Sequence, residues 1–136
     1  MRGRVCWVDA NVLLRFLTGE PEEMSRRALQ LMERSQRREV VLKVHSIAVA
    51  ETVWVLQSFY GYSRGEISEV LAQLLEDRGL QLEERRAVLG ALATMADANV
   101  DFADALLAER ARISGEGVAS FDGDFERLGA ELCTEL

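Results

Sequence analysis

Four carboxylates stand out because of where they lie relative to the apolar segments of the chain: Asp9, Glu51, Asp104 and Asp122. Asp9 follows the apolar run at residues 5–8, and Asp122 follows a second run at residues 118–121. Both runs are typical of buried strands, and ligands of open α/β sheets bind at the carboxyl ends of the strands. Asp104 falls in the first turn of a predicted helix, where the helix dipole favours an anion.

Glu51 lies in a segment, residues 47–56, that is apolar on every side. Such a helix is expected to be buried, and residues 47, 48, 54 and 55 share the face of Glu51. An ionised carboxylate there would be very costly unless it is paired or binds a metal. The sequence leaves two interpretations open, a Glu51–arginine ion pair and a metal ligand.

Each aspartate also has an ordinary structural explanation. Asp9 could cap a helix or stabilise a turn, Asp101 is well placed as an N-cap, and Asp124 fits a turn with Gly123. If Asp9, Glu51, Asp104 and Asp122 converge on one sheet edge, however, they repel one another and stay ionised together only around cations. Oxygen ligands suit Mg²⁺ or Mn²⁺, and these ions can lower the pKa of a bound water and clamp the oxygens of a phosphodiester.

The elements that must position these acids alternate along the chain. Strands are predicted at residues 5–8, 40–44, 80–82 and 117–121, with a last short run at 132. Helices are predicted at residues 11–17, 21–34, 46–60, 63–79, 84–96, 101–113 and 124–128. Pro21 at a first helical position, a Ser46 cap and a capping box of Ser63 with Glu66 mark three of the helix starts. This alternation predicts an α/β layer fold with a parallel sheet.

Hydrophobic spacing predicts which side chains form the core. Two helical stripes are expected to be buried: Met24, Ala28, Leu29, Leu31 and Met32 in the first, and Ile67, Val70, Leu71, Leu74 and Leu75 in the second. Trp7 and Trp54 are also assigned to the core. The single histidine, His45, is interpreted as structural.

Composition bounds the class of protein. The chain has 136 residues, which fits one domain spanning 1–136, and its hydrophobic fraction of 49% supports a substantial core. A net charge of −7 argues against binding nucleic acid through bulk positive charge. The two cysteines, Cys6 and Cys133, form neither a metal motif nor a disulfide framework. With no secretory or membrane-spanning segment, a soluble cytoplasmic protein with free thiols is expected.

Four segments carry a resemblance to a known family: Val8-Asp9-Ala10-Asn11-Val12-Leu13-Leu14-Arg15, Ala50-Glu51, Asp101-Phe102-Ala103-Asp104-Ala105-Leu106-Leu107-Ala108 and Ser120-Phe121-Asp122-Gly123-Asp124-Phe125. In order and spacing they resemble the PIN-domain ribonucleases, and most of all the VapC-type toxins of toxin–antitoxin pairs. The resemblance runs from about Arg4 to Leu128. One departure is Ala10, where many members carry Ser or Thr.

The resemblance has specific implications. It matches Asp9, Glu51, Asp104 and Asp122 to the family's acidic tetrad, with Asn11 and Ser120 in supporting positions. It implies a three-layer α/β/α fold around a mostly parallel central sheet, dependence on Mg²⁺ or Mn²⁺, and usually a homodimer. For toxin members it also implies a cognate antitoxin that blocks the active-site groove.

These observations lead to the hypothesis of metal-dependent endonucleolytic hydrolysis of RNA. Asp9, Asp104 and Asp122 would hold the metal, Glu51 would bind metal or orient the attacking water, and Arg15 is a candidate RNA contact. One alternative is a phosphatase or receiver-type protein phosphorylated at Asp9, but no lysine follows Lys43 to complete such a site. Another is a catalytically silent binding or scaffold domain, and metal titration would distinguish it from the nuclease.

Overall fold

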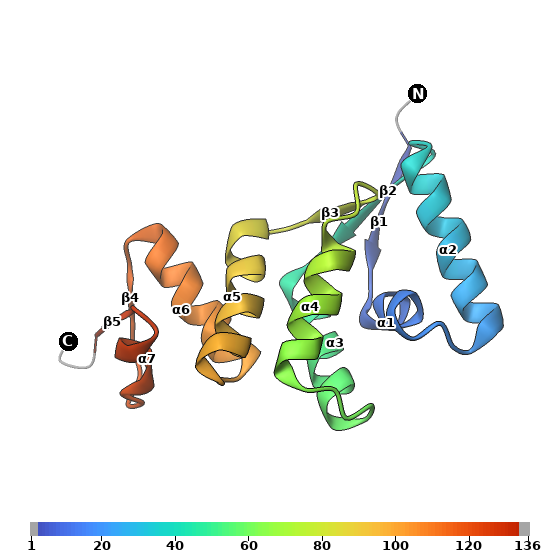
Figure 1. Ribbon diagram of the computed structural model, residues 1–136. Coiled ribbons are helices and arrows are strands. Elements are labelled where there is room, and N and C mark those ends of the chain that lie inside the picture. Colours follow the sequence, from blue (N-terminus) through green and yellow to red (C-terminus); the bar gives the residue numbers. More distant parts are fainter. Residues whose placement is uncertain (1–2, 134–136) are drawn as a thin grey trace.

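The computed structural model describes residues 3–133, and its helices and strands alternate as the sequence predicts (Figure 1). The strands are β1 (Arg4–Val8), β2 (Val40–Val44), β3 (Leu80–Leu82), β4 (Gly117–Val118) and β5 (Glu131–Leu132). The helices are α1 (Ala10–Thr18), α2 (Glu22–Gln36), α3 (Ser46–Ser58), α4 (Arg64–Leu75), α5 (Arg85–Ala98), α6 (Phe102–Ser114) and α7 (Asp124–Arg127). The predicted α/β fold class is confirmed.

The main sheet has three parallel strands in the order β1-β2-β3. Its register aligns Cys6 with Leu42 and Val8 with Val44, so alternate residues of both strands point to the same face. That face is buried: Val8, Leu42 and Val44 are at most 6% exposed. The prediction that residues 80–82 form an edge strand is also confirmed.

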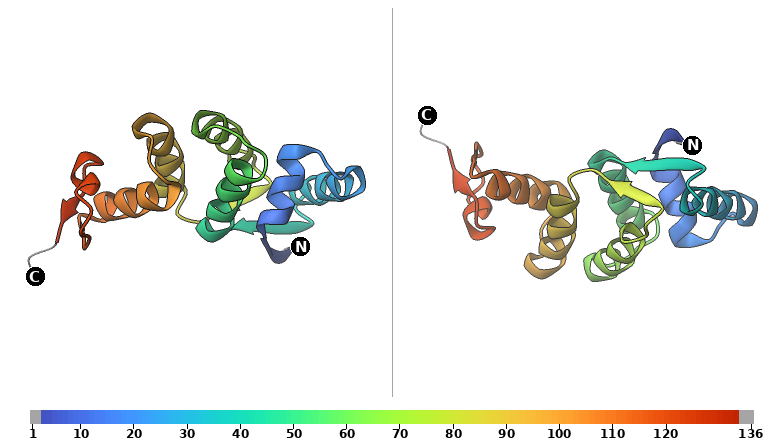
Figure 2. Two further views of the ribbon diagram at one scale, coloured as in Figure 1. Left: turned by 90° about the horizontal axis from the view of Figure 1, so that it is seen from below. Right: turned by 90° about the horizontal axis from the view of Figure 1, so that it is seen from above.

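The opposite face of β1 is open. Val5 is 49% exposed and Trp7 is 57% exposed, so the prediction that Trp7 lies in the core is wrong. The reason lies in the arrangement of the helices: α5 and α6 lie beside the sheet, beyond α3 and α4, instead of above β1 (Figures 1 and 2). Trp7 instead lies under the ammonium of Lys43, which is 5.4 Å from the centre of its ring.

Strands β4 and β5 form a second, separate parallel sheet at the far end of the molecule from β1 (Figure 2). The sequence predicts a strand over residues 117–121, but only Gly117 and Val118 pair with a neighbouring strand. Ala119 and Phe121 are both exposed, and Phe121 is fully so. A small core of Ala108, Ala111, Val118, Phe125 and Ala130 holds this end together.

The main core continues from the sheet into the helices. The predicted stripe on α4 is confirmed at Ile67, Leu71 and Leu75, which are fully buried, while Val70 and Leu74 are partly buried. The facing side chains are Val88, Leu92 and Met95 of α5 and Phe102 of α6, which belong to the same cluster. Buried contacts therefore link α4, α5 and the start of α6 in series.

The predicted helix starts are partly confirmed. The capping box is present, with Glu66 N donating to Ser63 Oγ (3.1 Å) and Ser63 N donating to Glu66 Oε1 (3.0 Å). Ser46 is the first residue of α3 and not its cap, because the His45 ring accepts from Ile47 N through Nδ1 (3.0 Å). Pro21 likewise precedes α2 instead of starting it.

The stripe predicted on α2 is wrong at two positions. Ala28 and Met32 are buried, but Met24 is 45% and Leu29 is 54% exposed. Leu29 lies on the exposed side of α2, and Met24 borders a depression between α1 and α2 that leaves it half exposed. Within the same residues, no helix is long and apolar enough to cross a bilayer.

Candidate active site

Asp9 lies where the sequence predicts it, directly after the carboxyl end of β1. It is also the N-cap of α1, and its Oδ1 accepts a hydrogen bond from Val12 N (3.1 Å). The structural role and the proposed chemical role are compatible, because a carboxylate has a second oxygen that this cap leaves available. Asp9 is exposed, so that oxygen can reach a ligand.

Glu51 lies on an exposed face of α3, so the prediction of a buried helix on all sides is wrong. Ile47 is 63% exposed and Trp54 is 68% exposed on the same face. The helix packs against the core through Val49, Val53 and Leu56 instead. Within residues 3–133 no arginine or lysine forms an ion pair with Glu51, which removes the arginine-pair interpretation.

Asp9 and Glu51 line one shallow depression of about 350 Å³. Its other lining residues include Trp7 and His45. The sequence analysis missed Trp7 as part of this surface because an aromatic in a short apolar strand is usually a core residue. The alternation of β1 carried a usable signal, since Val5 and Trp7 share one face and Cys6 and Val8 share the other.

Asp104, in the first turn of α6, and Asp122, in the loop after β4, form a second acidic group. Burial raises the pKa of the Asp104 carboxyl above its ordinary value, and the negative charges of Asp101, Asp122 and Asp124 raise it further. Asp101 occupies the N-cap position of α6 but caps no backbone N–H; its Oδ1 instead accepts from Arg64 Nη2 (2.7 Å). The predicted capping role of the Asp101 side chain is therefore wrong.

The loop that carries Asp122 is fixed by its own side chains. Ser120 Oγ accepts from Asp122 N (3.0 Å), and Asp122 Oδ1 accepts from Asp124 N (2.9 Å). Asp124 serves the turn that the sequence predicts for it and starts α7. Ser120 thus positions the backbone of Asp122 through this hydrogen bond.

The structure brings the four acids together as two pairs and not as one cluster. Asp9 and Glu51 share one depression, while Asp104 and Asp122 share one electrostatic environment. Within residues 3–133 of one chain, no group of three or more acidic, histidine or cysteine side chains is close enough to hold a metal ion. The ends of β1 and β4 lie at opposite sides of the molecule in both views of Figure 2.

Asn11 and Arg15 do not join either pair. Both line a different depression between α1 and α2, together with Val12, Met24 and Leu31. The Arg15 guanidinium donates through Nη1 to the Glu20 carbonyl (2.5 Å), and its Nε is buried without a partner within the described residues. This placement gives Arg15 a local structural role, and RNA contact stays a prediction.

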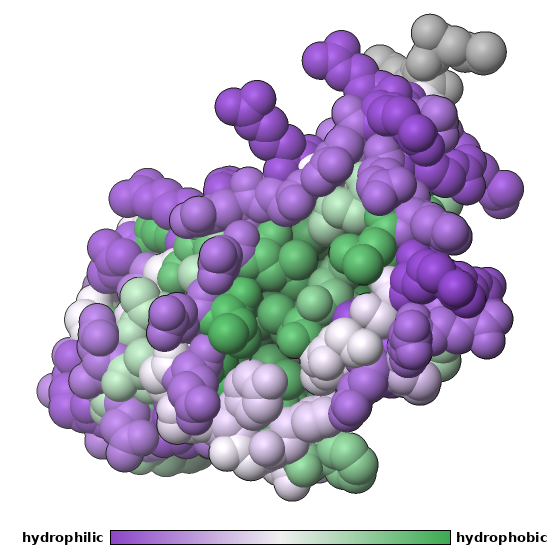
Figure 3. Space-filling model, turned by 45° about the vertical axis from the view of Figure 1, so that its right-hand side comes forward, coloured by the Kyte–Doolittle hydropathy of each residue, from purple (hydrophilic) through white to green (hydrophobic). Residues whose placement is uncertain are grey.

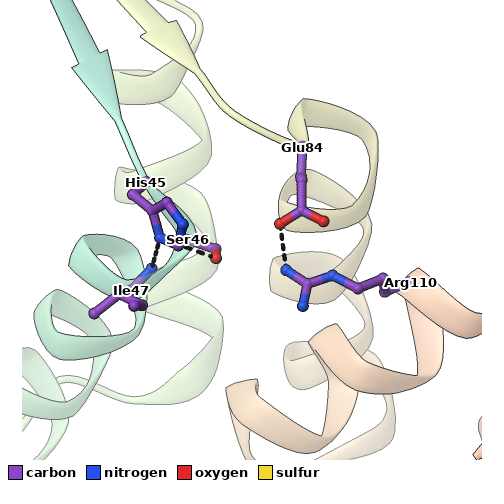
Figure 4. Close-up of polar contacts among 5 residues, drawn as sticks. All are labelled: His45, Ser46, Ile47, Glu84 and Arg110. Atoms are coloured by element: carbon purple, nitrogen blue, oxygen red, sulfur yellow. Dashed lines mark hydrogen bonds and ion pairs between the residues drawn. The ribbon is translucent and has the colours of Figure 1, made fainter. Parts of the chain in front are cut away.

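A larger depression, about 580 Å³, separates the start of α3 from α6. His45 and Ile47 line it on one side, and Leu107 and Arg110 line it on the other. Figure 4 shows the ion pair of Arg110 with Glu84 bordering this space, opposite the His45 cap. The sequence analysis did not single out Arg110 as a lining residue. Ala103 and Arg110 are seven residues apart, or two helical turns, and this spacing places both on the same face of α6.

Comparison with known proteins agrees with the α/β fold. The PIN domain family matches residues 6–131. A VapC ribonuclease of Aquifex aeolicus (strain VF5) is 29% identical over 123 residues, which cover 90% of this chain and 90% of that protein. The family match spans nearly all of the described fold, from β1 to β5. This chain therefore belongs to the PIN domain family.

Proposed function

We propose that this protein is a metal-dependent endoribonuclease that hydrolyses RNA phosphodiester bonds and acts as the toxin of a toxin–antitoxin pair. The observation that carries the proposal is the set of Asp9, Glu51, Asp104 and Asp122, carboxylates that have no cationic partner within residues 3–133. Membership of the PIN domain family and similarity to a VapC ribonuclease support it.

The chemistry of these donors fits Mg²⁺ or Mn²⁺. They are oxygen ligands only, and hard divalent ions prefer carboxylate oxygens. Burial raises the pKa of Asp104, the negative charges of Asp101, Asp122 and Asp124 raise it further, and a bound cation would offset that repulsion. When bound, such ions polarise a phosphodiester and lower the pKa of a bound water.

The side chains take complementary roles in this proposal. Asp9, Asp104 and Asp122 would hold the metal, and Ser120 keeps the Asp122 loop in place. Glu51 would bind metal or orient the attacking water and accept its proton at a carboxylate oxygen. The exposure of Glu51 supports this role, because RNA and water can reach it without a change in the fold. Asn11 and Arg15 would act from the adjoining α1 surface.

The proposed partners are RNA, a cognate antitoxin and a second copy of the chain. Figure 3, which brings the α1–α2 side forward, shows a hollowed hydrophobic area framed by hydrophilic side chains. Exposed Met24 and half-buried Leu31 belong to the apolar lining on this side. Such a surface favours association with protein. The protein would be active in the cytoplasm, where Cys6 and Cys133 would remain free thiols.

The substitution Asp9→Asn tests the catalytic assignment. Loss of one ligand charge is expected to lower the rate of RNA cleavage with Mg²⁺ or Mn²⁺ by at least ~10²-fold, because metal positioning and charge stabilisation both depend on it. A gel assay on a mixed RNA substrate measures this, with EDTA abolishing cleavage by the wild type. Asp97→Asn, at an exposed position of α5, is the matched control and should cleave normally.

The same pair of variants tests the toxin role in cells. Induced wild-type protein and Asp97→Asn should stop growth, whereas Asp9→Asn should not. Co-expression of the adjoining small gene should restore growth if that gene encodes the antitoxin. Equal cleavage by wild type and Asp9→Asn, or no cleavage by the wild type at all, would overturn the proposed function.

A further inference from the structure

We propose that two copies of this chain exchange their C-terminal segments, so that each active site combines Asp9 and Glu51 of one copy with Asp104 and Asp122 of its partner. Strand β4 of each copy would add, in parallel, to the free edge of β1 in the other. The activity of the completed site rests on the proposed function. The exchange of segments itself is argued from strand edges, exposed side chains and core packing.

The first observation is the free edge of β1. The strand pairs with β2 along all five of its residues, and no strand within residues 3–133 pairs with its other side. Unpaired backbone groups on an edge strand are a ready site for another strand. Val5 and Trp7, whose side chains project from this strand, are about half exposed.

The second observation is the incomplete strand β4. The apolar sequence of residues 117–121 predicts a strand of five residues, equal in length to β1, yet only Gly117 and Val118 are paired. β5 occupies one side of β4, and the other side has no partner among the described residues. A sheet of two such short strands is marginally stable by itself. A strand alongside residues 117–121 would supply the missing pairing.

Parallel pairing of β1 with β4 would also unite the acids. Asp9 follows the carboxyl end of β1, and Asp122 follows the predicted carboxyl end of the β4 run. Parallel strands place their carboxyl ends at the same sheet edge, so Asp9 and Asp122 would lie level there. Asp104 lies one turn before Ala108 of α6, which packs with Val118 of β4, and Glu51 lines one depression with Asp9, so the two acidic pairs would meet as one group of four.

The third observation is the distribution of uncovered apolar side chains. On the first half of the chain they include Val5, Trp7, Ile47 and Trp54; on the second half they are Leu107 and Phe121. Trp7 and Ile47 of the first set line the Asp9–Glu51 depression, and the second set lies near Asp104 and Asp122 in sequence. Surfaces that flank complementary halves of one site fit a second copy of the chain better than an unrelated partner.

Core packing favours exchange between copies over closure within one copy. To bring β4 to its own β1, the chain would have to separate α5 from α4 or α6 from α5. The first change would expose Leu71 and Leu92, which are fully buried, and the second would expose Phe102, which is 4% exposed. Joining to a partner keeps all of these contacts.

Contacts of Glu83 and Glu84 also hold the connection between β3 and α5 in the arrangement that keeps β4 far from the β1 of the same chain. Glu83 N donates to the Val44 carbonyl (2.9 Å), and the Glu83 carboxylate pairs with Lys43 (3.8 Å). Glu84 adopts a left-handed backbone conformation, with φ of 53°, and its carboxylate pairs with Arg110 of α6 (Figure 4). These contacts direct α5 and α6 away from their own sheet.

Cross-linking tests the pairing independently of activity. If Asp9 and Asp122 are level, Trp7 lies opposite Ser120, and directly opposite Cβ atoms in neighbouring strands are about 5 Å apart. We would place Trp7→Cys and Ser120→Cys together in a chain with Cys6→Ser and Cys133→Ser. A short bismaleimide should then join two chains into one covalent dimer on a denaturing gel, and Trp7→Cys alone should not be joined.

Two outcomes of the cross-linking experiment would overturn the exchange. A cross-link within single chains would show closure of each copy on itself. Absence of any cross-link in a folded double variant, with folding checked by circular dichroism, would show that β1 and β4 do not pair. Sedimentation of the wild type as a monomer at micromolar concentration would contradict it too.

Complementation of two inactive variants tests whether the site is shared. Refolded together, Asp9→Asn and Asp122→Asn should regain about a quarter of the wild-type rate, because half of the dimers would be mixed and one of their two sites would carry no substitution. Each variant refolded alone should stay inactive. No recovery in the mixture, with an active wild type, would place each site within one chain. An inactive wild type, together with a double-cysteine variant that still forms the covalent dimer, would overturn the proposed function and leave the exchange standing.

Discussion

Each half of this molecule carries two of the four candidate site carboxylates, but the halves differ in how these carboxylates are supported. Residues 4–82 build a three-stranded sheet, and the carboxyl end of its long strand β1 carries Asp9 directly. Residues 85–132 have strands of only two paired residues, and Asp122 lies on a loop held by Ser120 and Asp124. The first half is therefore a preformed platform, whereas β4 in the second half has one side without a partner among the described residues.

The largest expected effect on stability lies at the junction between these halves. Leu92→Ala should lower the free energy of unfolding by about 2–5 kcal/mol, because Leu92 of α5 is fully buried in the shared core and truncation leaves a cavity. Urea denaturation measures the loss. Leu29→Ala, on the exposed side of α2, should change it by less than about 0.5 kcal/mol. Similar losses in both variants would mean that α5 does not share a core with α4.

A smaller effect is expected within the first half, at the start of α4. Ser63→Ala should cost about 1 kcal/mol, because it removes the oxygen that accepts from Glu66 N. Glu69→Ala, at an exposed position inside the same helix, is the comparison variant and should cost less than the loss of the capping box. Thermal unfolding followed by circular dichroism distinguishes them. An unchanged midpoint in Ser63→Ala would show that the capping box contributes nothing to the platform.

The smallest effect on stability is expected in the second half, where the substitution should stabilise the metal-free protein instead of destabilising it. The pKa of Asp104 is raised in the folded chain by burial and by neighbouring carboxylates, so its ionisation at neutral pH destabilises the metal-free fold. Asp104→Asn should therefore raise the midpoint of unfolding in EDTA at pH 7, by roughly 1–3 °C. Protonation removes the same cost, so the gain should shrink as the pH falls towards about 4.

Two further measurements complete that test. Added Mn²⁺ should stabilise the wild type more than Asp104→Asn, because only the wild type retains the full set of ligands. Asp97→Asn, at an exposed position on α5, serves as the control for loss of a surface charge. A lower midpoint for Asp104→Asn in EDTA at pH 7 would contradict the cost of ionising Asp104 in the folded chain.

Local patterns predicted much of the fold because their causes are local. The alternation of strands and helices, the Ser63–Glu66 capping box and the stripe of Ile67, Leu71 and Leu75 depend on residues a few positions apart. The errors fall where burial depends on distant elements. Trp7, Glu51 and Trp54 have apolar neighbours in sequence, but whether their faces are covered depends on where α5 and α6 pack.

The sequence by itself determined the four carboxylates, their places after strands and in helices, and the α/β character of the chain. Tertiary structure alone decided that Asp9 and Glu51 share one surface while Asp104 and Asp122 share another. The physical reason is that hydrogen-bonded turns and helices are set by neighbouring residues, whereas the pairing of β4 is not. That pairing depends on which strand edge is free, and α4, α5 and α6 hold β4 away from the β1 of the same chain.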